Sequence, residues 1–138
     1  MIFYRLDFDD PKFRKGFQTT LRLGRKHFDA ITKLLRDHET VVLKLCKTNC
    51  DKVVSFGTLR SIECLYWDQL SKTEIATNHV ARDEWKLKNA MMDAYAKIIT
   101  NNDELTMIGF DIMHDDDDND GGEDIINTPS TPPLSLVR

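Results

Sequence analysis

Apolar residues are spread through the chain as far as Met113 and become sparse after it, and this boundary decides which part can build a core. Residues 114–138 contain the aspartate run Asp115–Asp118, a Gly-Gly pair and an end rich in threonine and proline. A segment of that composition buries too little apolar surface to offset the entropy lost on ordering. We therefore expect a single globular domain over residues 1–113, followed by a disordered acidic tail over residues 114–138.

The hydrophobic pattern of residues 1–113 predicts several strands. Apolar and polar side chains alternate over residues 2–8, which is typical of a half-buried strand, and residues 105–113 are predicted as a last strand. The β-branched segments 40–47 and 52–56 flank a turn-like sequence and predict a hairpin. Residues 58–67 fit either a helix or a strand.

Two helices are predicted between these strands. Asp10-Pro11 is a typical helix start, and one apolar stripe continues over residues 11–38, with Gly24 marking a place where this helix can divide into two pieces. The stripe consists of Phe13, Phe17, Leu21, Phe28, Ile31 and Leu35. The capping-box pattern from Ser71 to Glu74 opens a second helix that extends to about Thr100.

The resulting order of elements, β-α-β-β-x-α-β with x undecided, predicts an α+β fold. Two helices can cover a small, mostly antiparallel sheet in this order, and a ferredoxin-like plait is one arrangement that satisfies it.

The net charge of −4 combines a basic part with an acidic one. Residues 1–110 hold 18 basic and 15 acidic residues, whereas residues 111–138 hold one basic and eight acidic residues. Over residues 11–60 the imbalance reaches 12 basic against four acidic residues. Such asymmetry favours an anionic partner for the basic part.

The predicted first helix concentrates this positive charge on one face. At 100° per residue, seven cations fall within an arc of about 120°, opposite the apolar stripe. They are Arg14, Lys15, Arg22, Arg25, Lys26, Lys33 and Arg36. A solvated helix face explains lysine and arginine equally well, but such faces usually carry glutamate too, and none occurs between residues 11 and 38. We therefore expect a small, non-catalytic nucleic-acid-binding protein whose phosphate contacts come from this face and whose acidic tail modulates binding.

A protein-interaction or inhibitor module, binding an acidic surface of another protein, is the alternative. A homodimer is a further alternative, with Trp67 and Trp85 as the candidate exposed apolar residues. Aromatic side chains can stack on single-stranded bases only if they lie on an open sheet face. For the five candidate aromatic residues we favour positions in the core. These are Tyr4, Phe8, Phe56, Tyr66 and Trp67.

Metal sites and catalysis find little support in the sequence. Cys46, Cys50, Cys64 and His79 could supply a zinc tetrad, but cysteines among apolar neighbours are more often core residues, and no cofactor is expected. Residues 116–121 match only the first half of a calcium-binding loop. His79 and Asp83, one helical turn apart, form the best acid–base pair, but no nucleophile accompanies them.

The sequence favours a location inside the cell. It has no apolar run of about 18 residues, which a membrane-spanning helix needs, and no apolar signal-peptide core near its start. It also has three cysteines, an odd number that suits free thiols. We expect an intracellular protein, in the cytoplasm or in the nucleus of a eukaryotic cell, without a membrane partner.

Overall fold

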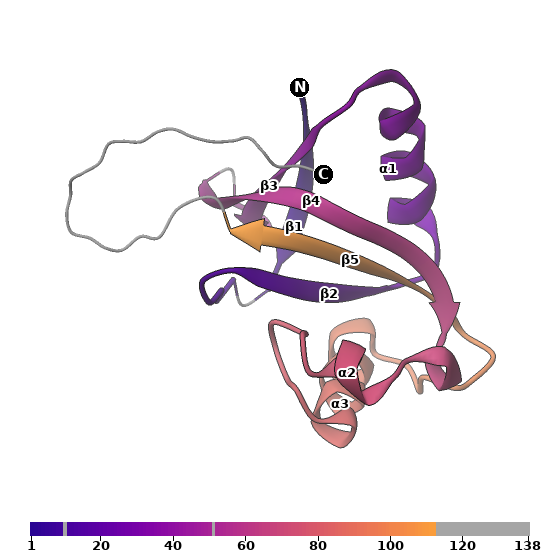
Figure 1. Ribbon diagram of the computed structural model, residues 1–138. Helices are drawn as coiled ribbons and strands as arrows, with labels where there is room; N and C mark the ends of the chain where they lie inside the picture. Colours follow the sequence, from indigo (N-terminus) through magenta and orange to yellow (C-terminus); the bar gives the residue numbers. More distant parts are fainter. Residues whose placement is uncertain (10, 51, 113–138) are drawn as a thin grey trace.

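The computed structural model describes residues 1–9, 11–50 and 52–112 and has an α+β fold built on one five-stranded sheet (Figure 1). The prediction that residues 114–138 are disordered falls outside the described residues. In chain order the elements are β1 (Ile2–Phe8), β2 (Phe17–Leu23), α1 (Lys26–Asp37), β3 (Val41–Lys47), β4 (Val53–Tyr66), the 3-10 turn η1 (Trp67–Gln69), α2 (Lys72–Ile75), α3 (Glu84–Tyr95) and β5 (Glu104–Ile112).

The sheet is mixed and mostly antiparallel, as predicted. Its strand order is β1-β3-β4-β5-β2, in which β1 pairs with β3 in parallel and every other pair is antiparallel. The predicted first strand, hairpin and last strand are confirmed, and the ambiguous residues 58–67 continue β4 as far as Tyr66. The ferredoxin-like plait is not confirmed, because the sheet has a fifth strand and places β1 and β2 at its two edges.

The predicted helix over residues 11–38 is wrong in its first half, where the chain forms β2. Phe17 and Leu21 are four residues apart, and an even spacing fits one face of a strand as well as one face of a helix. Gly16 and Gly24 have φ angles of +83° and +81° and bracket β2. Because this left-handed backbone is accessible mainly to glycine, the two glycines separate β2 from its neighbours. The helix itself begins only at Lys26.

The predicted second helix is also too long. Its capping box is confirmed at Ser71 and Glu74, but α2 ends at Ile75 and α3 starts only at Glu84. Between the two helices the chain runs beside β2, where Thr19 accepts a hydrogen bond from the His79 amide and donates its own amide to the Thr77 carbonyl. This pairing with a strand edge competes with helix formation in the segment.

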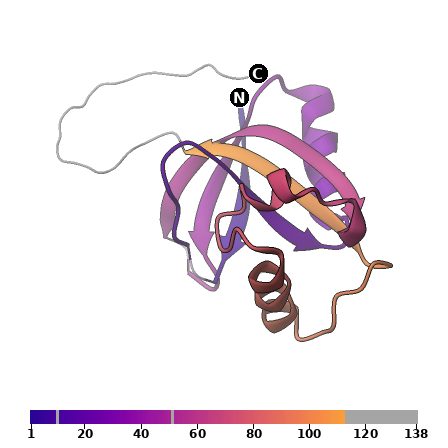
Figure 2. The ribbon, with the colours of Figure 1, turned by 60° about the horizontal axis from the view of Figure 1, so that its bottom comes forward.

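Two hydrophobic clusters occupy opposite faces of the sheet. In β5, Ile108 and Phe110 belong to the cluster beneath α1, which contributes Ile31, whereas Met107 belongs to the cluster beneath α2 and α3. Successive residues of a strand point to opposite faces, so α1 covers one side and α2 and α3 the other (Figure 2).

Candidate functional site

The seven predicted cations do not lie on one helix face, because the helix that would align them is interrupted by β2. Arg14 and Lys15 precede β2, Arg22 lies within it, Arg25 is the N-cap of α1, and Lys26, Lys33 and Arg36 belong to α1. The exposed side of α1 also carries acidic side chains, Asp29 and Asp37. The prediction of a single basic face over residues 11–38 is therefore wrong in its geometry.

Two of the seven cations hold the fold together. Arg14 donates hydrogen bonds to the Thr77 and Asn78 carbonyls at 2.9 and 3.0 Å, and burial lowers its pKa. Arg25 pairs with Asp29 at 3.1 Å and with Glu104 at 3.4 Å. Their charges are used largely within the protein, whereas Lys33 and Arg36 have exposed side chains on α1.

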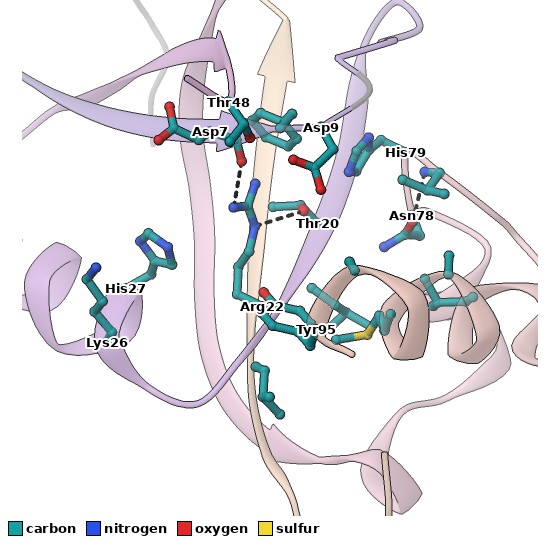
Figure 3. A pocket seen from close by; sticks show the side chains of 18 residues that line it. Asp7, Asp9, Thr20, Arg22, Lys26, His27, Thr48, Asn78, His79 and Tyr95 are labelled. Carbon is teal, nitrogen blue, oxygen red and sulfur yellow. Dashed lines mark hydrogen bonds between the residues drawn. The ribbon is translucent and has the colours of Figure 1, made fainter. Parts of the chain in front are cut away.

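Arg22 and Lys26 line a cavity of about 530 Å³ between the two edges of the sheet (Figure 3). The Arg22 guanidinium spans from β2 to β1, where its Nη1 donates to the Asp7 carbonyl at 2.8 Å. The start of α1 and the buried side of α3 supply other walls. A volume of this size is typical of ligand-binding pockets, which range over about 300–1,000 Å³.

Arg22 is the central charge of this cavity. Its Nε donates to the Thr20 hydroxyl at 3.3 Å, and its guanidinium lies 4.5 Å from the centre of the Phe8 ring. No carboxylate among the described residues forms an ion pair with it. Burial lowers the pKa of Arg22, and more distant groups, Tyr95 and Asp7 foremost, act in the opposite direction. A partly buried cation without a directly paired anion favours an anionic ligand group.

His27 lies beside Arg22 and is neutral at pH 7. Burial, followed by the charges of Arg22 and Lys26, lowers the pKa of His27 from 6.5 to about 4. Its Nδ1 forms a hydrogen bond of 2.6 Å with the Tyr4 hydroxyl, whose own pKa is raised by burial. The cations of the cavity at neutral pH are therefore Arg22 and Lys26, and the carboxylates of Asp7 and Asp9 line it as well.

The wall opposite these cations is mainly apolar. Leu87, Met91 and Ala94 of α3 line it, together with Tyr95, which is 37% exposed. Asp9 lies at the cavity near Thr20 (Figure 3). The cavity can thus hold an anionic group beside Arg22 and an apolar or flat group against α3.

Sequence reasoning missed the polar residues that accompany Arg22. One usable signal was the alternation of Gln18, Thr20 and Arg22 with Phe17, Leu21 and Leu23, interrupted only by Thr19, which is typical of a strand with a polar face. Thr20, His27 and Tyr95 come from three separate elements, so no local pattern links them.

The other sequence-based candidates also change. His79 and Asp83 are not on one helix: His79 lies before α3, and Asp83 is the N-cap that accepts from the Lys86 amide at 3.1 Å. Among the described residues no group of three or more His, Cys, Asp or Glu side chains is placed to hold a metal ion. The four residues considered as a zinc tetrad, Cys46, Cys50, Cys64 and His79, therefore do not form such a group. The half-matched calcium loop at residues 116–121 falls outside the described part of the chain.

The aromatic candidates divide between core and surface. Phe8 and Trp67 are 4% exposed, and Trp67 donates its indole hydrogen to Glu84 at 3.2 Å, so it is not the exposed dimer residue that the sequence suggested. Trp85 is 74% exposed. Across residues 1–9, 11–50 and 52–112, no helix is long and apolar enough to cross a membrane.

No protein-family model, no curated protein and no solved structure matches this chain, so its function has to be inferred from the cavity and the cations around it.

Proposed function

We propose that this chain is a non-catalytic nucleic-acid-binding protein that holds backbone phosphates at Arg22 and Lys26. The observation that carries the proposal is the Arg22 guanidinium, which is partly buried, lacks an ion-pair partner among the described residues and faces an open cavity. Guanidinium groups suit phosphate because their planar donors match its oxygens. Lys26 adds a second positive charge at the same cavity.

Other predicted cations extend the contact in this proposal. Lys33 and Arg36 continue along α1 from Lys26, and Lys15 is exposed before β2. Arg14 and Arg25 act mainly by holding the surrounding loops, since both are engaged by neighbouring groups. The acidic residues beyond position 112 compete for the cations and so modulate binding.

Replacing Arg22 and Lys26 by glutamine tests the proposal. Each phosphate contact adds about 0.9 to the slope of log affinity against log salt concentration, so the double variant is expected to lower the slope by about 2. Fluorescence anisotropy with labelled single- and double-stranded DNA and RNA at several salt concentrations measures it. The matched control is Lys72→Gln/Lys86→Gln, which removes two charges from exposed positions outside the cavity. Equal slopes for the two double variants would reject the assignment.

Lys26→Gln alone guards against misfolding, because Lys26 is exposed and makes no hydrogen bond that holds β1 to β2. This single variant is expected to lower the slope by about 1. Circular dichroism and urea unfolding then establish whether the double variant remains folded.

A protein-interaction or inhibitor module is the second candidate function. It is favoured by Trp85 on α3 and Ile98 after it, each of which is 74% exposed. Large exposed apolar side chains often mark protein interfaces. This function predicts stoichiometric binding to a protein, loss of that binding in Trp85→Ala, and no affinity for DNA or RNA. A homodimer through Trp85 would instead raise the mass measured by light scattering.

A further inference from the structure

On the side of the sheet opposite α1, the cluster beneath α2 and α3 takes its strand residues from β2, β4 and β5 and none from β1 or β3. The parts of β1, β3 and β4 that lie beyond this cluster carry aromatic and basic side chains on that side. Phe3, Arg5, Lys44, Val54 and Phe56 form this surface, which we call the open face. Arg5 is in register with Lys44, and Lys44 with Phe56, so the three residues form a row across the strands. None of the five belongs to either hydrophobic cluster beneath the helices.

Of the two aromatic rings of the open face, that of Phe3 is exposed and that of Phe56 is partly buried. Phe3 is 49% exposed and Val54 is 45% exposed. The Phe3 and Phe56 rings are in edge contact with their centroids 6.0 Å apart, and the Lys44 Nζ lies 5.2 Å from the centre of the Phe3 ring. The ring of Phe3 is thus held in place by two neighbours while much of its surface stays open to a ligand.

The charges around these rings are predominantly positive. Lys52, which precedes β4, is exposed. With Arg5 and Lys44 it makes three cations, against Asp7 of β1, which pairs with Arg5 at 2.7 Å. A second copy of the chain docked here would bring two positive surfaces together, which is unfavourable. A polyanion is the complementary partner.

We propose that the open face binds single-stranded nucleic acid, with bases stacked on Phe3 and Phe56 and phosphates near Lys44 and Lys52. Aromatic rings on a sheet, flanked by cations, suit unpaired bases, whereas the bases of a duplex are already stacked on one another. This inference rests on the proposed nucleic-acid function, but it uses residues separate from the cavity around Arg22.

The test compares Phe3→Ala with Phe17→Ala in the full-length chain. Phe17 is a matched control, because it is 44% exposed and lies at the other edge of the sheet, in β2. The probe is a fluorescein-labelled oligothymidylate, followed by anisotropy, with a labelled duplex measured in parallel. Phe3→Ala is expected to weaken single-strand binding about tenfold, as for the loss of one stacked base, and to leave duplex binding unchanged. Phe17→Ala is expected to bind both probes like the unmodified chain.

Equal single-strand affinity for Phe3→Ala and the unmodified chain would overturn the inference, and so would no binding of oligothymidylate at low salt. If Phe3→Ala binds normally but Arg22→Gln/Lys26→Gln is impaired, the open face is rejected and the cavity stands. If only Phe3→Ala is impaired, the open face stands and the cavity is rejected. A dimer in light scattering that Phe3→Ala dissociates, without oligothymidylate binding, would assign the face to a second copy. Lys44→Gln, which leaves both rings intact, is expected to lower the salt slope by about 1.

Discussion

His27 lies beside two cations in a partly buried position, and we expect it to make folding stability depend on pH. Its pKa is about 4 in the folded chain, mainly because of burial, against an ordinary value of 6.5 when unfolded. Between these values the unfolded chain binds the proton more tightly, so stability is lost as the pH falls through this window. His27→Gln is expected to remove about 1 kcal/mol of the difference in unfolding free energy between about pH 7 and pH 5, after allowance for solvent screening. Urea unfolding at the two pH values measures it.

Tyr4→Phe separates the causes of this dependence. It removes the hydroxyl that meets His27 Nδ1 at 2.6 Å but keeps the burial and the charges of Arg22 and Lys26. Because burial is the largest cause, most of the pH dependence should persist in this variant. An NMR titration of His27 with a midpoint near 6.5 would contradict the explanation.

At the scale of elements, the sequence predicted the strands and helices whose hydrophobic pattern fits only one type of secondary structure. Residues 2–8 alternate in polarity and form β1, and the largely apolar segment predicted as the last strand forms β5 (Glu104–Ile112). Phe17 and Leu21 satisfied helical and strand spacing alike, and only pairing with β5 decides in favour of β2. His79 lies in a segment whose sequence pattern predicts a helix. In the structure its amide instead donates a hydrogen bond to the Thr19 carbonyl at the edge of β2. Such long-range pairing is not visible in a local pattern.

Gly24 sets the boundary between β2 and α1, and its replacement tests that role. Its φ is +81°, no atom stands within 4 Å of where a Cβ would lie, and its amide donates to the Glu104 carbonyl at 2.7 Å. Gly24→Ala therefore introduces backbone strain without a steric clash, and it is expected to lower the unfolding free energy by about 1–2 kcal/mol. Gly24→Asn should lose less, since asparagine tolerates left-handed backbone. Urea unfolding of both variants measures the difference, and equal losses would exclude backbone strain as the cause.

At the scale of the whole molecule, curvature of the sheet creates the cavity. Asp7, Arg22 and Tyr95 come from β1, β2 and α3, and they meet because the edges of the sheet approach one another. The sequence predicted Arg22 as a binding residue on one face of a long helix, and Arg22 instead lies in β2. Its companions could not be predicted, because their proximity depends on the strand order β1-β3-β4-β5-β2 and not on any spacing along the chain.

The separation of charge along the chain gives a prediction for the whole molecule. Asp115–Asp118 are four of the eight acidic residues beyond position 110, and they belong to the same molecule as the cations of α1 and β2. If they compete with nucleic acid for those cations, replacing all four by asparagine should raise affinity at low salt, and the gain should shrink as salt screens the competition. Asp68→Asn/Asp93→Asn is the control, because it changes net charge at two exposed positions of the folded domain. If the control raises affinity by half as much as the fourfold variant, net charge alone is responsible, because it removes half as many negative charges. If the control does not raise affinity, the competition is located in residues 115–118.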